Sequence, residues 1–434
     1  MPISKRRSKQ QTKILEAILG LCLVMTSGCG SGSAAPEQST AVPEASAGVS
    51  AARNADYSAF RNTKVLVPED APLYVRDGGS YVQHGLFRAN ALLDISDEED
   101  GQFLKVSGSD FYADGATVKT SDRWFRNQTH LVPYPSVLST ADSYTIQDAR
   151  GREVAAVEDR AAEYAVYVQP SADDPRYGIL YQNGVYFIPR DEVAGVKDDA
   201  VAGSDAPQAD AMPVMMYHFF YDASKGETRK DGNDMEVQEF EDQLSHLSQG
   251  GYSTLTMQEV DEFMDGRARI PAKSVAITMD DNDPSVHAYA YPLLKKFQDN
   301  AVIFVICGWS PAQMPYDMWE MREDGIELQS HGFLMHQGGC SGEGHGGRLL
   351  CVDHDTGVQD TKESMDYVDG GFVYAYPFGD VNDSAKQIVK DAGIKLAFTT
   401  REGWIRPDED HYELPRVRVS GGESIETYMN SITE

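Results

Sequence analysis

Residues 274–282 read SVAITMDDN, and this stretch decides the fold and the chemistry of the C-terminal half of the chain. The short apolar run at 274–278 predicts a buried strand. Asp280 and Asp281 follow directly after its end. In parallel barrel enzymes, catalytic groups lie at the carboxyl ends of the strands. Because an Asp-Asp pair alone is usually a solvated turn, the neighbouring strands decide whether these carboxylates form a site.

Two further strand candidates also end in chemically useful residues. The strand predicted at 326–330 is followed by His331 and His336, two histidines five apart. They can converge on one metal ion if the segment between them turns back, and imidazole is a common ligand of such ions. The strand predicted at 372–376 is followed by PFG at 377–379, a turn that can present a backbone N–H. Each motif alone is weak, but three in this order, each after a strand, favour a catalytic site.

The whole segment 212–434 alternates strand-like and helix-like runs, which predicts an α/β fold. Besides the three strands above, strand-like runs occur at 213–217 and 301–306. The helix-like runs are 237–249, 257–265, 287–298, 316–324 and 384–392.

Residues 212 to about 420 resemble the polysaccharide deacetylase family, also called the NodB-homology or carbohydrate esterase 4 family. The similar segments are MPVMMYH at 212–218, GYSTLTMQEV at 251–260, SVAITMDDN at 274–282, YPLLKKFQDNAVIFVI at 291–306, IELQSHGFLMH at 326–336, YAYPFGD at 374–380 and ELPRVRV at 413–419. The histidine spacing of five resembles the branch that acts on poly-β-1,6-N-acetylglucosamine. The resemblance implies a distorted (β/α) barrel over 212–434. It also implies metal-dependent removal of N-acetyl groups from an extracellular amino-sugar polymer, such as poly-N-acetylglucosamine, peptidoglycan or a chitin-like glycan.

The resemblance also assigns roles to individual residues. Asp280 would be the general base that takes a proton from water, and Arg416 would orient it. The backbone N–H of Phe378 would stabilise the oxyanion. One divalent ion, zinc first and Co, Ni, Mn or Fe as alternatives, would bind between an aspartate and two histidines. These metal ligands would be Asp281, His331 and His336. His218 we expect to be structural.

The sequence departs from the family pattern at several positions. Met279, Asn282 and Gly332 replace the usual Phe, Gly and Thr or Ser. The late Leu-x-x-His motif, which supplies a general acid in many members, is absent, and His411 is the nearest substitute. Two alternatives to an N-deacetylase therefore stay open: an O-acetyl polysaccharide esterase, or a catalytically weak, wall-tethered carbohydrate-binding protein.

The N-terminus has the pattern of an export signal. Basic residues precede the apolar run AILGLCLVM at 17–25, which predicts a signal peptide over 1–28. Small residues before Cys29 resemble a bacterial lipobox, so we expect a lipid on Cys29 that anchors the protein to the membrane. The Gly-, Ser-, Ala- and Pro-rich segment 29–61 predicts a flexible tether. These features predict an extracytoplasmic, lipid-anchored bacterial cell-surface protein with no ordinary transmembrane helix.

Between the tether and the α/β segment, short strand-like runs predict a β-rich region. We expect two SH3-like barrels, at 62–133 and 134–197, and an acidic linker at 198–211. Wall binding by this region is one functional hypothesis, and a spacer or a packing partner for the next domain is the alternative.

Charge and cysteine content add two expectations. The net charge is −30, because 38 Lys and Arg stand against 68 Asp and Glu, which excludes nucleic acid as a partner. In an oxidising compartment we expect a disulfide between Cys340 and Cys351, with two free thiols as the alternative.

Overall fold

Seven parallel strands close into a barrel in the C-terminal half. Around the barrel their order is β16 (Val214–Tyr217), β26 (Leu414–Arg418), β25 (Leu396–Glu402), β24 (Val373–Ala375), β23 (Glu327–Ser330), β22 (Val302–Val305) and β21 (Ser274–Met279). A direct pairing of β21 with β16 closes the ring, and the short strand β19 (Ser253–Thr254) pairs with the other edge of β21. This arrangement confirms the (β/α) barrel expected for the C-terminal segment.

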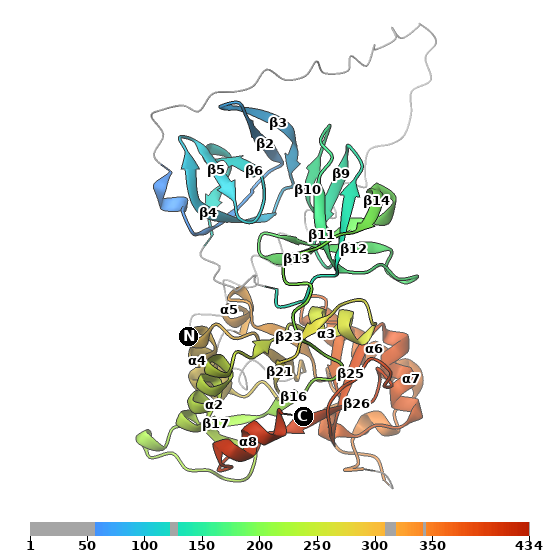
Figure 1. The fold of residues 1–434 in the computed structure, drawn as a ribbon. Coiled ribbons are helices and arrows are strands. Elements are labelled where there is room, and N and C mark those ends of the chain that lie inside the picture. The colour runs from blue at the N-terminus through green and yellow to red at the C-terminus, as the bar shows by residue number, and fades with distance from the viewer. Residues whose placement is uncertain (1–56, 122–128, 309–317, 342–343, 434) are drawn as a thin grey trace, which may run out of the picture. The chain divides into compact units, whose positions relative to one another are not determined.

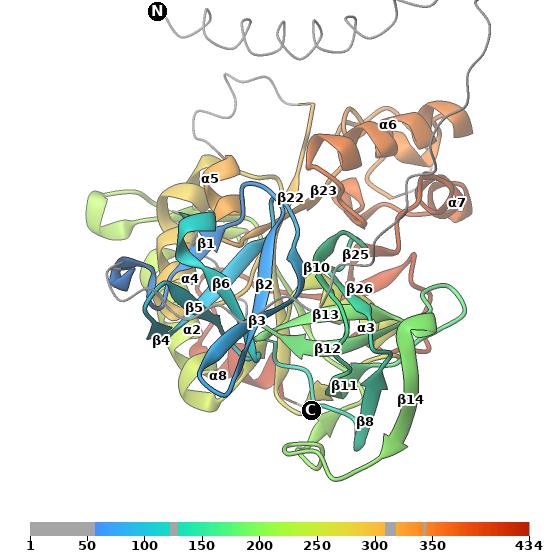
Figure 2. The same cartoon turned by 90° about the horizontal axis from the view of Figure 1, so that it is seen from above.

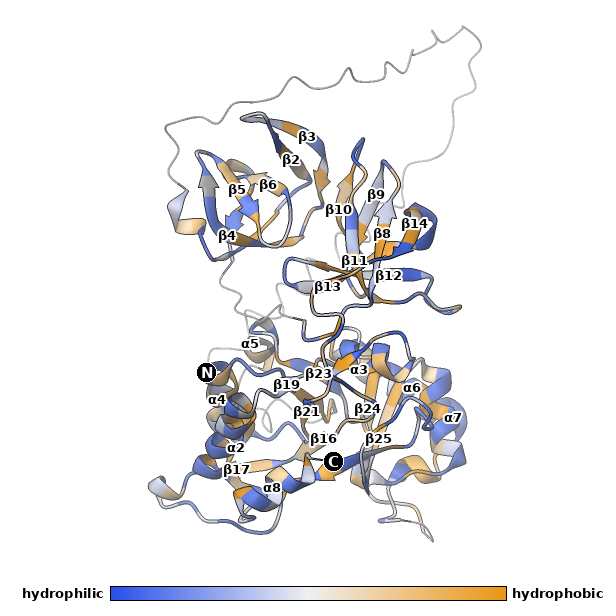
Figure 3. Cartoon of the chain, viewed as in Figure 1, coloured by the Kyte–Doolittle hydropathy of each residue, from blue (hydrophilic) through white to orange (hydrophobic). Residues whose placement is uncertain are grey.

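The strands are short and almost wholly apolar, as expected for a parallel sheet that is covered on both faces. All residues of β16, β21, β22 and β24 are buried. In Figure 3 orange gathers on the barrel strands around the labels β16 and β24, whereas the surrounding helices carry much blue. Burial of this apolar surface is the main force that stabilises the barrel.

Helices connect the strands and cover the outside of the barrel (Figure 1). They are α2 (Val237–Gly250), α3 (Met257–Met264), α4 (Tyr291–Phe297), α5 (Met318–Glu323), α6 (His354–Tyr367), α7 (Asp383–Ala392) and α8 (Ile425–Ser431). A capping box at Thr256 and Glu259 begins α3, and Gly393 in the left-handed conformation ends α7. Helices α6 and α7 pack side by side in both views (Figures 1 and 2).

The region before the barrel is built of antiparallel strands. The strands are β1 (Lys64–Leu66), β2 (Ala71–Asp77), β3 (Ser80–Phe87), β4 (Leu92–Asp100), β5 (Phe103–Val106), β6 (Phe111–Asp114), β7 (Lys119–Thr120), β8 (Ser136–Thr140), β9 (Tyr144–Gln147), β10 (Glu153–Val157), β11 (Glu163–Val168), β12 (Arg176–Tyr181), β13 (Gly184–Pro189) and β14 (Val193–Asp198). Pairing of β3 with β10 joins β1–β7 to β8–β14 in one continuous strand order. The β-rich region is therefore confirmed, while the SH3-like topology, the module boundaries and the linker at 198–211 stay predictions.

This computed structural model describes residues 57–121, 129–308, 318–341 and 344–433. The expected signal peptide, Cys29 and nearly all of the expected tether lie outside the described residues. No helix in the described ranges is long and apolar enough to cross a membrane.

Candidate active site

The two adjacent carboxylates after β21 point to different partners. Asp281 and Asn282 both have positive φ angles, +72° and +54°, so the backbone turns sharply where the strand ends. Aspartate and asparagine tolerate this left-handed conformation better than most residues. The turn allows Asp280 to contact Arg416 while Asp281 contacts the two histidines.

Asp280 forms a buried, two-pronged ion pair with Arg416 of β26. Two guanidinium nitrogens donate to the two carboxylate oxygens, each at 2.7 Å, and the exposed fractions are 3% for Asp280 and 0% for Arg416. Arg416 also donates to the Thr399 carbonyl at 3.0 Å and the Thr278 hydroxyl at 3.2 Å, so its orientation is fixed. Burial by itself raises the pKa of Asp280, but the charge and hydrogen bonds of Arg416 outweigh burial and lower it. The carboxylate is therefore ionised at neutral pH.

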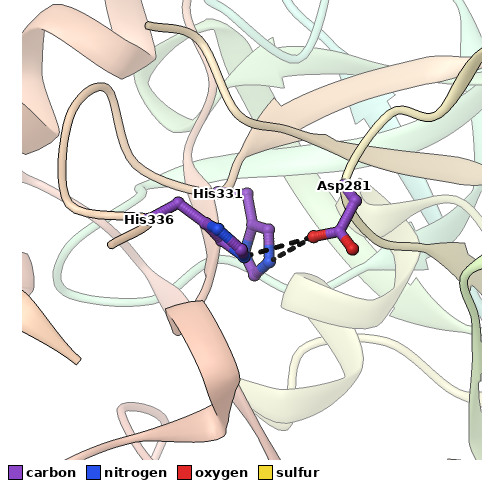
Figure 4. A group of neighbouring side chains, drawn as sticks. All are labelled: Asp281, His331 and His336. Atoms are coloured by element: carbon purple, nitrogen blue, oxygen red, sulfur yellow. Dashed lines mark ion pairs between the residues drawn. The ribbon is translucent and has the colours of Figure 1, made fainter. Parts of the chain in front are cut away.

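Asp281, His331 and His336 converge from two loops, as Figure 4 shows. One Asp281 oxygen lies 3.4 Å from Nε2 of His331 and 3.2 Å from Nε2 of His336, and one donor atom of each residue lies within 4.8 Å of the others. Burial raises the pKa of Asp281, but its hydrogen bonds to both imidazoles outweigh burial and lower it.

The surroundings of this group suit a divalent metal ion. Nδ1 of His331 donates to the Ala375 carbonyl at 2.7 Å, which fixes the ring and leaves Nε2 on the side of Asp281. Imidazole ligands of metals are commonly oriented by such a bond on the other ring nitrogen. One carboxylate and two imidazoles are also the donor types that zinc and similar ions prefer.

Helix α6 holds the loop that carries both histidines. Its Asp360 accepts hydrogen bonds from the backbone N–H groups of Phe333 at 3.0 Å and Leu334 at 2.7 Å. Gly332 has a φ of +83°, and a Cβ there would lie 3.1 Å from the Tyr374 hydroxyl. Glycine therefore fits this position better than the usual Thr or Ser, and Asp360 supplies the anchoring contacts of the loop.

The PFG turn after β24 lies against the histidines. The ring centroids of Phe378 and His336 lie 4.7 Å apart, and Phe378 is 37% exposed. Phe378 has a φ of +62°, which is unusual for a bulky residue. Such strained backbone persists only where the surroundings hold it, and it is frequent at active sites.

A cleft of about 310 Å³ opens over these groups. Five of the six sequence-predicted site residues line it: Asp280, Asp281, His331, His336 and Phe378. The sixth, Arg416, lies behind Asp280 and below the surface. The lining also includes the following further side chains: His218, Phe219, Asn233, His345, Tyr376, Thr400 and Arg418.

None of these seven further residues was assigned a catalytic or metal-binding role from the sequence, and two of them are histidines. His218, which we expected to be structural, has its Nε2 4.0 Å from a carboxylate oxygen of Asp280. Burial lowers the pKa of His218, although the charges of Asp280 and Asp281 oppose this shift. His345 comes from the loop between Cys340 and Cys351, which the structure closes with the expected disulfide. His411, the nearest substitute for the late histidine motif, does not line the cleft and lies 3.9 Å from Asp265 instead.

The barrel and the cleft at the carboxyl ends of its strands define the class of the protein, a parallel-barrel protein with a candidate active site at that end of the barrel. Comparison with known proteins gives the family. Residues 267–397 match the sequence profile described as polysaccharide deacetylase, so this part of the chain is a region of that family. The resemblance stated from the sequence is thereby confirmed.

Curated relatives belong to the branch indicated by the histidine spacing. Poly-β-1,6-N-acetyl-D-glucosamine N-deacetylase of Staphylococcus aureus (strain MRSA252) is 28% identical over 196 residues, which are 42% of this chain and 66% of that protein. The enzyme of the same name from Staphylococcus epidermidis (strain ATCC 35984) is 28% identical over 206 residues, 44% of this chain and 70% of that protein. The chain thus spans just under two thirds of the S. aureus relative.

Solved structures of deacetylases also resemble the chain. Streptococcus pyogenes deacetylase PplD in complex with acetate is 26% identical, with a TM-score of 0.45 over 52% of this chain and 99% of that one. IcaB from Ammonifex degensii is 24% identical, with a TM-score of 0.42 over 52% of this chain and 96% of that one.

Proposed function

We propose that the protein is a metal-dependent N-deacetylase of an extracellular amino-sugar polymer, with poly-β-1,6-N-acetylglucosamine as the first candidate. The observation that carries the proposal is the joint presence, in one cleft, of the Asp280–Arg416 pair and the Asp281–His331–His336 group. A fixed, ionised base beside a metal-ligand set is what hydrolysis of an unactivated amide requires. The names of the curated relatives support the choice of substrate.

The chain's own residues account for the steps of hydrolysis. A divalent ion held by Asp281, His331 and His336 would acidify a water molecule and polarise the acetamide carbonyl. Asp280 would take the proton of the attacking water, since Arg416 keeps its carboxylate ionised and fixed. The Phe378 N–H would donate to the developing oxyanion. His218 would protonate the leaving amine, because it lies in the same cleft within 4.0 Å of Asp280 and can pass on the proton that the base has taken. The products would be acetate and a free amine on the sugar.

Acetate release tests this proposal directly. The purified chain is treated with a chelator and then with Zn, Co, Ni, Mn or Fe, and is assayed on β-1,6- and β-1,4-linked N-acetylglucosamine oligomers. We expect metal-restored release that falls by about 10²–10⁴-fold in Asp280→Asn. Asp283→Asn is the matched control, because Asp283 follows in the same loop but contacts the Ser285 N–H rather than the cleft groups. Release from O-acetylated glycans alone would indicate an esterase, and binding without any release would indicate the carbohydrate-binding alternative.

We also infer that the protein acts outside the cytoplasm, anchored by a lipid on Cys29. The basic and apolar pattern before Cys29 supports this location, as does the disulfide between Cys340 and Cys351, since disulfides persist mainly in oxidising compartments. Labelling of cells with a fatty-acid probe should mark the wild type and leave Cys29→Ala unmarked. Equal labelling of both would refute the anchor.

A further inference from the structure

A buried carboxylate fixes a second loop at the cleft. Asp380 follows the PFG turn and is 6% exposed. Its two oxygens accept from the backbone N–H of His345 at 2.8 and 2.9 Å, and one of them also accepts from the N–H of Gly347 at 2.8 Å. Three hydrogen bonds to one buried carboxylate hold the loop against the turn that carries Phe378.

Two glycines allow the backbone of this loop to come close to Asp380. Gly344 has a φ of +53°, and a Cβ there would lie 2.1 Å from an Asp380 oxygen. A Cβ on Gly347 would lie 3.0 Å from the other oxygen and 3.2 Å from the Phe378 ring. Glycine is therefore needed at both positions for the backbone to reach the carboxylate. The disulfide between Cys340 and Cys351 closes the loop, which limits its movement.

The loop carries one imidazole to the cleft. Nδ1 of His345 lies 3.1 Å from the same Asp380 carboxylate, so Nδ1 donates this hydrogen bond and Nε2 is the second hydrogen-bonding atom of the ring. No partner of Nε2 is seen in the described parts of the chain. The His345 side chain is 73% exposed, compared with 15% for His218 and 18% for His336 in the same cleft. His345 is therefore the histidine of the cleft that is oriented by the protein yet open to a ligand.

We propose that His345 is a substrate-binding residue whose Nε2 forms a hydrogen bond with a hydroxyl group of the glycan outside the reacting acetamide. This assignment rests on the proposed deacetylase function. When the acetamide reaches Asp280 and the metal ligands, the rest of the sugar extends toward the open side of the cleft, where His345 is exposed. A fixed imidazole at that place discriminates a sugar polymer from a small acetyl compound, because only the polymer has hydroxyls there. Asp380 acts as the positioning residue that keeps the ring in place.

The test separates binding from chemistry. His345→Ala, His345→Gln and the wild type are assayed on β-1,6-N-acetylglucosamine oligomers and on 4-nitrophenyl acetate, which has no sugar. One lost hydrogen bond predicts an increase of KM for the oligomer of about tenfold in His345→Ala, with kcat within about twofold. His345→Gln keeps a hydrogen-bonding group and should recover part of the loss. Hydrolysis of 4-nitrophenyl acetate should be unchanged in both variants.

His354→Ala is the matched control, since His354 is a half-exposed imidazole held by Asp391 and Asp355 away from the cleft. Oligomer binding is also measured by calorimetry in the Asp280→Asn background, where turnover does not interfere, and should weaken about tenfold on removal of the His345 ring. An unchanged KM and affinity would overturn the proposal. A fall in kcat with KM unchanged would overturn it too, since His345 would then act in the chemical step. If the wild type releases no acetate but binds the oligomer through His345, the proposed deacetylase function is refuted and the binding role of His345 stands.

Discussion

Removal of the Arg416 guanidinium, which lies behind the proposed base Asp280, should destabilise the whole barrel as well as abolish activity. Arg416→Met has a similar volume, but it removes four hydrogen bonds that Arg416 donates, two to Asp280, one to Thr399 and one to Thr278. It also leaves the carboxylate of Asp280, only 3% exposed, without a counter-charge. Breaking one partner of a buried ion pair costs about 3–5 kcal/mol. We expect that loss in the free energy of unfolding at pH 7, measured by urea denaturation.

The contribution of the Asp280–Arg416 pair to the free energy of unfolding should depend on pH, and the lowered pKa of Asp280 gives the direction. The folded-state pKa of Asp280 is lowered, so the pair's contribution is complete above the unfolded carboxyl value of about 4 and is lost as the pH falls through the folded value. In Arg416→Met burial is the largest remaining influence; it raises the pKa of Asp280, so the carboxyl protonates at a higher pH than in the wild type. The stability gap between wild type and variant should therefore be largest at pH 7 and shrink toward pH 4.

A double-mutant cycle isolates the interaction. Asp280→Asn combined with Arg416→Met should be less destabilised than the sum of the two single variants, with a coupling of about 2–3 kcal/mol. A single-variant loss below about 1 kcal/mol, a gap independent of pH, or additive effects would refute the reasoning that this pair holds the base ionised and fixed.

Further variants probe the remaining parts of the site. His336→Ala should abolish stoichiometric metal binding, measured by elemental analysis of the dialysed protein, while His354→Ala should retain the ion; retention by both would exclude the proposed ligand set. His218→Asn should lower kcat on N-acetylglucosamine oligomers by about 10²-fold while 4-nitrophenyl acetate, whose leaving group needs no proton, is affected far less; equal effects on both would indicate a structural role. Cys351→Ser should lower the free energy of unfolding by about 2–3 kcal/mol, because Cys340 and Cys351 close a loop with a sequence separation of 11, and an unchanged denaturation midpoint would contradict this.

The strands that end at the candidate site residues could be predicted because their sequence pattern is local. The expected strands at 274–278 and 326–330 correspond to β21 and β23, and the helix expected at 237–249 corresponds to α2. Each has an uninterrupted apolar run or a clear apolar face with a recognisable end. The expected helix at 287–298 is α4 preceded by a π-helical turn, Val286–Ala290, and Pro292 near the start of α4 removes one backbone donor there.

Helix α6 was missed because the buried positions of this helix are not apolar. They are Gly357, Asp360, Thr361 and Ser364, and such residues give no hydrophobic period. These residues instead form contacts with other parts of the chain: Asp360 anchors the loop that carries His331 and His336, and Ser364 forms a hydrogen bond with Ser330 at the end of β23. The place of His345 was missed for the same reason, because its partner Asp380 lies 35 residues further along the chain.

Three departures from the family pattern, at Met279, Asn282 and Gly332, leave the proposed site groups in place, and the structure gives the reason for each. Met279 is fully buried in the barrel core, where a flexible apolar side chain can replace an aromatic one. Asn282 adopts the positive φ that the usual glycine allows, and it is fully buried. Gly332 gives up a side-chain hydrogen bond, but Asp360 binds the next two backbone N–H groups of the same loop. Because none of these changes moves Asp280, Asp281 or the two histidines apart, the geometry favours an active deacetylase over a protein that only binds glycan.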